Sequence, residues 1–226
     1  MSRYVLLFIL ITTTARAQES GIPVGTPEHG TLIDAVALPL ESDFHLKITR
    51  GRERWWGTSA LVNLILNTAE RFHESWPQRV LVGDLSARDG GDISLHRSHE
   101  NGLDVDIGYP TRSGREQDPE SLRGFEHNMV SDEGRISWDF NAEATWDLAR
   151  FFVADARVQR IFVAPQIKAL LCRLARRRGE RESEAETLRR LTPLQNHHDH
   201  MHVRMYCPEG ATGCENLEEP DAGTGC

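Results

Sequence analysis

Apolar and polar residues alternate in two stretches of the chain, 103–109 and 200–205, and this period of two is typical of β-strands. Because successive side chains of a strand point to opposite faces, Asp106 lies on the polar face of the first strand. His200 and His202 share the polar face of the second strand for the same reason. The pattern therefore predicts two half-buried strands whose polar faces can meet at one site.

Elsewhere in the chain, segments with helical spacing of apolar residues are mixed with short apolar runs. Residues 59–72 have the spacing of a helix, Asn141 is a suitable N-cap for a second helix, and Pro165 is a suitable first residue for a third. The runs 79–82 and 161–163 are predicted to be short buried strands. This mixture predicts an α+β fold: a single domain in which helices flank a central antiparallel sheet that carries the polar residues.

The N-terminus has the features of a secretory signal sequence. A basic residue, Arg3, precedes an apolar run at 4–11, and the segment 15–17 offers small residues where a signal peptidase cuts. The run is shorter than the roughly twenty apolar residues of a membrane span, and the alternative is a short amphipathic core segment. We expect residues 1–17 to be removed and residues 18–226 to form one secreted domain.

The net negative charge of the mature chain argues against a nucleic-acid partner. Removing residues 1–17 takes away two of the 26 basic residues and none of the 34 acidic ones, so the mature net charge is 24 − 34 = −10. A nucleic-acid-binding domain needs a basic surface, so we expect no nucleic-acid partner. No later stretch is apolar enough to span a membrane, and the pattern contains no heptad repeat that would indicate an oligomeric state.

All four cysteines lie in the last quarter of the chain. An even number in an exported protein suggests disulfides, and four cysteines allow three pairings. Cys207 and Cys214 enclose a short loop that could close locally, which would leave Cys172 to pair with Cys226. A cysteine zinc site is disfavoured because no Cys-x-x-Cys spacing is present.

Six of the ten histidines fall in two short stretches, which have the spacings His-x-x-His-x6-Asp and His-x-x-His-x-His. Catalytic zinc takes three ligands of the histidine and carboxylate kind and leaves a fourth position open. Clustered histidines can also belong to a solvated surface, but two clusters on predicted strand edges favour a metal site. The candidate residues are His96, His99, Asp106, His197, His200 and His202.

Four segments of the chain resemble the penicillin-insensitive murein endopeptidases. They are 82–86, 94–107, 160–163 and 197–204. This family is part of the wider group of lysostaphin-type and D-Ala-D-Ala metallopeptidases, whose shared signature is His-x6-Asp followed by His-x-His. The resemblance extends from about Val80 to the C-terminus, with both halves of the signature in the right order.

The resemblance implies a role for each candidate residue. His99, Asp106 and His202 match the zinc ligands, and His96 matches a histidine that binds the metal or lies directly beside it. His200 matches the histidine that stays unligated and acts in catalysis, and His197 matches a further active-site histidine. Because imidazole changes charge near neutral pH, His200 is the first candidate for the proton carrier, with His197 as helper or oxyanion stabiliser. Asp199 is a weaker candidate base, because strand alternation would point it away from His200.

The resemblance also bears on cofactors and disulfides. One Zn²⁺ ion is expected; a second is doubtful, because Glu133 could supply an acid but Ile136 stands where a histidine would be expected. The family favours the pairings Cys207–Cys214 and Cys172–Cys226. Independently of the resemblance, the segment 111–134 is polar, contains several glycines and is the longest irregular stretch, so we expect it to line or cover the active-site cleft.

The resemblance implies an activity. It is hydrolysis of peptidoglycan cross-links between D-alanine and meso-diaminopimelate in the periplasm, by a metal mechanism that offers β-lactams no serine to acylate. Two alternatives remain open from the residues alone. One is a D-Ala-D-Ala carboxypeptidase or dipeptidase. The other is a zinc-containing cell-wall-binding module without turnover. His197 and His200 argue against this alternative, because a binding module does not need proton-transfer residues beside its metal site.

Overall fold

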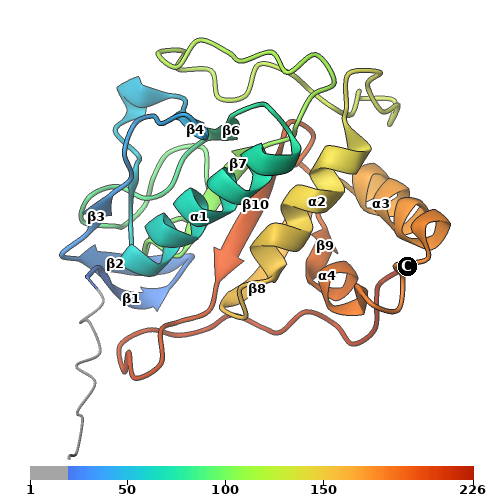
Figure 1. Cartoon of the computed structure of the whole chain (residues 1–226). Helices are drawn as coiled ribbons and strands as arrows, with labels where there is room; N and C mark the ends of the chain where they lie inside the picture. The colour runs from blue at the N-terminus through green and yellow to red at the C-terminus, as the bar shows by residue number, and fades with distance from the viewer. Residues whose placement is uncertain (1–19) are drawn as a thin grey trace, which may run out of the picture.

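The computed structural model describes residues 20–226, so the predicted signal sequence at 1–17 lies outside the described residues. Its centre is a six-stranded sheet in the order β4-β6-β7-β10-β8-β9 (Figure 1). The strands of this sheet are β4 (His45–Lys47), β6 (Val80–Val82), β7 (Asp104–Gly108), β8 (Val158–Val163), β9 (Leu191–Pro193) and β10 (His200–Met205). Four helices accompany it, so the predicted α+β class is confirmed.

Strand direction divides the sheet into a centre and two edges. The four central strands β6, β7, β10 and β8 pair in antiparallel fashion, as expected, whereas β4 pairs with β6 and β9 pairs with β8 in parallel. In the register of the central pair, His202 lies opposite Asp106 and Arg204 lies opposite Asp104. The two strands singled out by alternation are therefore direct neighbours, although they are nearly a hundred residues apart in the chain.

The helices begin where the sequence predicts. The side chains of Thr58 and Asn141 accept hydrogen bonds from the first-turn N–H groups of Leu61 and Ala144, which caps α1 and α2. Pro165 opens α3, and Gly179 closes it in a left-handed conformation. The helices are α1 (Ser59–Ser75), α2 (Ala142–Val153), α3 (Pro165–Arg178), α4 (Ala185–Arg190) and the short 3₁₀ turn η1 (Arg50–Arg52).

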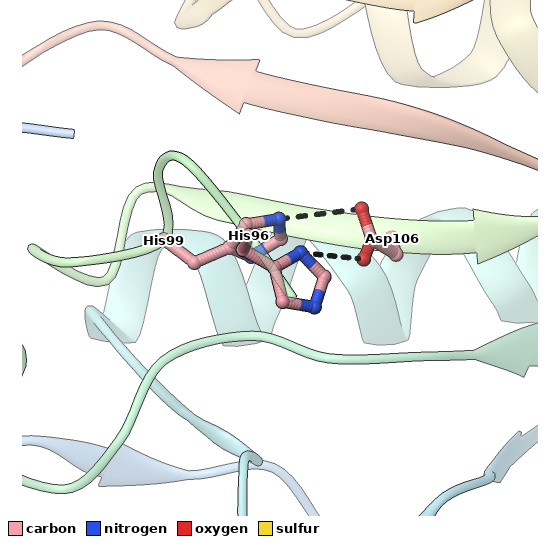
Figure 2. Close-up of side chains that lie close together, drawn as sticks. All are labelled: His96, His99 and Asp106. Carbon is pink, nitrogen blue, oxygen red and sulfur yellow. Dashed lines mark ion pairs between the residues drawn. The ribbon is translucent and has the colours of Figure 1, made fainter. Parts of the chain in front are cut away.

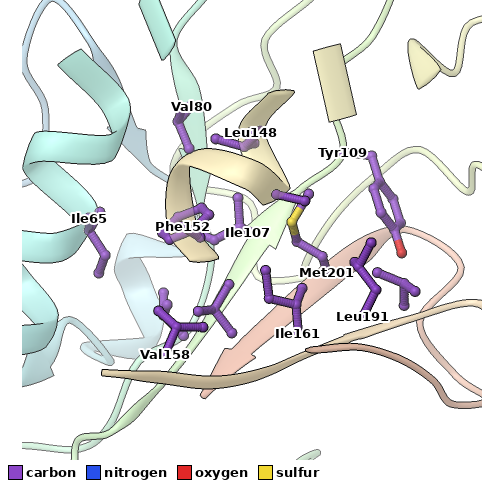
Figure 3. Close-up of a cluster of buried hydrophobic side chains, with 14 of the residues drawn as sticks. Ile65, Val80, Ile107, Tyr109, Leu148, Phe152, Val158, Ile161, Leu191 and Met201 are labelled. Carbon is purple, nitrogen blue, oxygen red and sulfur yellow. The ribbon is translucent and has the colours of Figure 1, made fainter. Parts of the chain in front are cut away.

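The two faces of the sheet have different chemistry. Asp106 of β7 projects toward His96 and His99 on one face (Figure 2). The other face packs against the helices, and Figure 3 shows Leu148 and Phe152 of α2 over apolar side chains of the central strands. The prediction of half-buried strands needs correction, because the polar face of β7 is also buried: the segments around the sheet cover it as well.

Two small sheets and two disulfides complete the fold. The small sheets are β1 (Ile22–Thr26) with β2 (His29–Ile33), and β3 (Val36–Ala37) with β5 (Trp56–Gly57). Cys207 is bonded to Cys214, and Cys172 of α3 is bonded to Cys226, so both pairings implied by the family resemblance are confirmed. Among the described residues, no helix is both long enough and apolar enough to cross a membrane.

Candidate metal centre

Strand pairing brings the two histidine stretches together. His202 of β10 lies opposite Asp106 of β7, and directly opposite side chains on adjacent strands are about 5 Å apart. His200 occupies the same face of β10 two residues earlier. The loop before β7 supplies His96 and His99, so the structure gathers the predicted residues of both stretches on one face of the sheet.

His99 is fixed in an unusual backbone conformation. Its φ of 75° lies in the left-handed region, which is uncommon for a residue other than glycine and is often found at functional sites. Its N–H donates to Asp104 Oδ2 at 3.2 Å, and its ring Nδ1–H donates to the Leu85 carbonyl at 2.9 Å. Metal-binding histidines are oriented by such a hydrogen bond to the second ring nitrogen. This arrangement directs Nε2 of His99 toward Asp106.

Asp106 is the common neighbour of the imidazole rings. Its Oδ1 lies 3.3 Å from His99 Nε2, 3.5 Å from His202 Nδ1 and 3.5 Å from His200 Nε2. Its Oδ2 lies 3.6 Å from His96 Nδ1 (Figure 2). Although burial raises the pKa of this carboxyl group, His99 and the other histidines hold it well below its usual range, so the carboxylate is ionised.

These separations fit ligands that share a metal ion. Two atoms that each lie about 2.0–2.1 Å from a tetrahedral zinc ion are roughly 3.3 Å apart, which is longer than a normal hydrogen bond. Asp106 Oδ1 and His99 Nε2 are buried without a hydrogen-bond partner, a rare state for polar atoms. The nitrogen of His202 that faces Asp106 is Nδ1, whereas its Nε2 faces Asp104. Burial also lowers the pKa of His202 to about 4, which keeps its ring in the neutral form that binds metals.

His200 has the surroundings of a proton carrier. Its Nδ1–H donates to Asp199 Oδ1 at 2.6 Å, and its ring stacks on Phe125 with centroids 5.3 Å apart. Burial lowers the pKa of His200, but the carboxylates of Asp106 and Asp199 outweigh that effect and raise it. The expectation that Asp199 points away from His200 is wrong, because β10 begins at His200 and strand alternation does not extend to the residue before it.

His197 reaches the same cluster from the loop before β10. Its ring centroid lies 5.1 Å from that of His200 and 6.1 Å from that of His202. The Nδ1–H of His197 donates to the Gln195 carbonyl at 2.9 Å, and the hydroxyl of Tyr109 donates to the His197 carbonyl at 3.1 Å. Burial and the nearby His200 lower the pKa of His197, so this ring favours the neutral form.

The family is decided by comparison with known sequences. The sequence model of the penicillin-insensitive murein endopeptidases matches residues 23–226. The chain belongs to this family.

Named relatives give the same result. The penicillin-insensitive murein endopeptidase of Klebsiella pneumoniae is 31% identical over 205 residues, which cover 90% of this chain and 73% of the relative. The protein of the same name from Salmonella arizonae is 33% identical over 208 residues, with the same two shares. The one from Haemophilus influenzae is 31% identical over 211 residues and is covered to 70%. The similarity to these relatives therefore covers most of this chain.

Sequence reasoning missed a buried carboxylate behind His96. Oδ2 of Asp84 accepts hydrogen bonds from Arg52 at 2.8 Å, from Arg54 at 3.1 Å and from His96 Nε2 at 3.1 Å. Burial raises the pKa of Asp84, but the hydrogen bond from His96 and the surrounding cations lower it below its usual range. Asp84 thus fixes the His96 ring with Nδ1 toward Asp106. The only sequence signal for Asp84 was its position in 82–86, one of the segments that resemble the murein endopeptidases.

A second missed carboxylate, Asp104, supports the histidines from the neighbouring position of β7. Both of its oxygens accept hydrogen bonds from Arg204, at 2.8 and 2.9 Å, and Oδ2 lies 3.3 Å from His202 Nε2. Asp104, His99 and His202 are close enough to form a metal-binding group themselves. However, the guanidinium of Arg204 already compensates Asp104, whereas Asp106 forms no ion pair with an arginine or lysine among residues 20–226. Asp106 is therefore the better candidate ligand, and Asp104 contacts the ring of His202 and the backbone N–H of His99.

Breaking the buried pair should destabilise the protein. Arg204→Ala leaves the Asp104 carboxylate buried without its cation, which costs about 3–5 kcal/mol of the free energy of unfolding. Denaturant unfolding of the disulfide-intact protein measures this loss. The matched control is Arg135→Ala, which breaks an exposed pair with Glu133 and should cost about 1 kcal/mol or less. Equal stability of the two variants would show that the Asp104–Arg204 pair is not structurally important.

The possible second metal site has no further support among the described residues. Ile136 forms a backbone bridge with Val130, and the carboxylate of Glu133 accepts hydrogen bonds from Ser131 and Arg135. Within residues 20–226, the groups close enough to hold a metal ion contain His96, His99, Asp104, Asp106 and His202 and do not include Glu133.

Proposed function

We propose that this member of the family is a zinc-dependent murein endopeptidase that hydrolyses the D-alanyl–meso-diaminopimelyl cross-link of peptidoglycan. The proposal depends above all on the buried Asp106 carboxylate, whose Oδ1 lies at ligand-to-ligand distance from His99 and His202 and has no hydrogen-bond partner. The names of the relatives support murein as the substrate and endopeptidase as the activity.

The proposed ligands of the zinc ion are His99, Asp106 and His202. Imidazole and carboxylate are the donors of catalytic zinc sites, and three such ligands leave one position for the reaction. His96 lies beside this set, with one ring nitrogen 3.6 Å from Asp106 and the other bonded to Asp84. Zinc in such a site polarises the substrate carbonyl and activates a water molecule.

The remaining side chains carry out proton transfer. His200 accepts the proton of the attacking water at Nε2 and delivers it to the amide nitrogen that leaves, because imidazole changes charge near neutral pH. Asp199 holds Nδ1–H of His200 and stabilises the charged ring between these two steps. His197 is kept neutral by burial, and its single proton lies on Nδ1, bonded to the Gln195 carbonyl. Its Nε2 is therefore an acceptor, so His197 acts as a helper that can accept a hydrogen bond from the attacking water.

Two further properties follow from this proposal. The reaction forms no acyl-enzyme, so a β-lactam finds no serine to acylate and the activity is insensitive to penicillin. We place the protein in the periplasm, because residues 1–17 have the features of a signal sequence and the two disulfides suit an oxidising compartment.

The products formed from purified cross-linked muropeptide dimers test this function. The protein lacking residues 1–17 should convert dimers to monomers, which mass spectrometry detects, and should leave free pentapeptide stems unshortened. Release of D-alanine from the stems with intact dimers would instead identify a carboxypeptidase. Binding to sacculi without new amine termini would identify a binding module.

A further inference from the structure

A cleft of about 790 Å³ lies beside the metal centre. The side chains of His96, His197 and His202 line one part of it, and Phe162 and Arg160 of β8 line another. β8 is the neighbour of β10 on the side away from β7 (Figure 1). A substrate bound to the metal centre therefore has room to extend over β8.

The cleft contains two guanidinium groups that have no carboxylate partner among the described residues, those of Arg97 and Arg160. Arg204 also lines the cleft, but Asp104 neutralises it. Arg97 is exposed, whereas Arg160 is half-buried and held in place by the backbone carbonyl of Glu218, to which it donates a hydrogen bond. Arg160 is therefore the better-positioned cation of the two.

The guanidinium of Arg160 is incompletely satisfied. Its Nε is buried without a hydrogen-bond partner, although buried donors are usually paired. The carboxylates of Glu218 and Glu219 are near enough to raise its pKa, but burial and the positive charge of Arg204 outweigh them and lower it. A bound anion in the cleft would compensate the charge of this guanidinium and accept hydrogen bonds from its accessible N–H groups.

Strand pairing sets the distance from Arg160 to the reaction centre. Phe162 lies opposite His202, and Arg160 lies opposite Arg204, two residues further along the strand. The Phe162 ring is 5.3 Å from the His202 ring, and the Arg160 guanidinium is 5.5 Å from the Phe162 ring. The guanidinium is therefore at most about 11 Å from the centre of the His202 ring, the sum of these two separations. A carboxylate on the residue next to the scissile bond would lie between them, because one residue of extended chain spans about 3.5 Å and a bound carboxylate lies about 3 Å from a guanidinium.

The rim of the cleft favours a peptide with small apolar side chains. Leu95 and Leu194, which both line the cleft, are 81% and 46% exposed, unlike most large apolar residues of the protein. The lining also carries charges of both signs, with Glu28 and Glu218 beside the arginines, and Arg160 is the half-buried cation nearest the Phe162 ring. A peptide with methyl groups and a free carboxylate matches that chemistry.

We propose that Arg160 binds a free carboxylate on the residue that contributes the nitrogen of the scissile amide, and thereby determines substrate specificity. This inference rests on the proposed function, in which that nitrogen belongs to the D-centre of meso-diaminopimelate. The same carbon bears a free carboxylate, so the group lies directly beside the bond that is cut.

Binding to an inactive, zinc-loaded protein tests this role directly. The background is His200→Ala, and the probes are a cross-linked dimer with a free carboxylate at this position and the same dimer with that carboxylate amidated. Adding Arg160→Gln should raise the Kd for the free-acid dimer about tenfold to hundredfold, the usual worth of a charge-assisted hydrogen bond. The Kd for the amidated dimer should change less than about threefold. Arg160→Lys should restore part of the affinity, because it keeps the charge without the planar fork.

The matched control is Arg181→Gln, which removes the same charge from a different pocket and should leave both Kd values unchanged. Equal effects of Arg160→Gln on both dimers, or no effect on either, would overturn the role of Arg160. Zinc content, measured in each variant, separates this result from a damaged metal centre. Cleavage of dimers by the wild-type protein is scored separately, so a failure of the proposed endopeptidase function remains distinguishable from a failure of this inference.

Discussion

Replacing His202 with alanine is expected to remove the metal ion and the hydrolytic activity together. His202 Nδ1 lies 3.5 Å from Asp106 Oδ1, and the ring is neutral and buried, as a zinc ligand requires. Loss of one of three ligands should leave far less than one zinc ion per chain after dialysis. Because the metal supplies several kcal/mol of transition-state stabilisation, kcat/KM on cross-linked dimers should fall at least about 1000-fold.

The neighbouring residue His198 provides a matched control for this substitution. The backbone carbonyl of His198 accepts a hydrogen bond from the N–H of Met129. His198→Ala should therefore keep about one zinc ion per chain and near-normal turnover. Elemental analysis of the dialysed proteins gives the zinc content. A His202→Ala protein that retained its full zinc content would contradict the proposed ligand set.

Replacing His200 with alanine should separate metal binding from catalysis. His200 is hydrogen-bonded to Asp199 and stacked on Phe125, and it is proposed to carry a proton and not to bind the zinc ion. His200→Ala is therefore expected to keep about one zinc ion per chain and to lose about 10²- to 10⁴-fold in kcat, the usual contribution of general acid–base catalysis. Single-turnover cleavage of dimers, measured beside zinc content, tests this.

Asp199→Asn is the companion variant. It keeps the shape of the side chain and removes the charge that stabilises protonated His200, so it should lower kcat by less than His200→Ala while keeping the zinc ion. If His200→Ala and His202→Ala lost zinc to the same extent, the division between ligand and proton carrier would be wrong.

Alternation of side chains was sufficient to predict the centre of the fold. Because a strand exposes every second residue on the same face, Asp106 on one strand and His200 and His202 on the other could be assigned to polar faces from the sequence alone. The pairing of the two strands and its register were not predicted from the sequence; the structure places His202 opposite Asp106.

The supporting residues could not be predicted, for physical reasons. Asp84 meets Arg52 and Arg54 through loop packing between segments about 30 residues apart, which no local periodicity encodes. Asp199 lies one residue before β10, where the strand rule does not apply. Phe125 belongs to the irregular segment predicted to cover the cleft, and only the three-dimensional structure shows its ring stacked on His200.

Glycine also has a role at the centre that spacing did not indicate. A side chain at Gly83 or Gly108 would meet the ring of Phe125, at 2.7 and 2.9 Å from a Cβ atom. The absence of these side chains lets Phe125 approach the sheet and reach His200. The segment over the site is thus positioned by Gly108 at the end of the central strand β7 and by Gly83 directly after β6.

The most direct test of the account is a zinc titration of the metal-free protein, with conversion of purified cross-linked dimers to monomers as the readout. The account predicts no conversion without metal, and activity that rises in proportion to added zinc and stops rising at one ion per chain. Full activity in metal-free protein, or dimers left intact at full zinc occupancy, would contradict it.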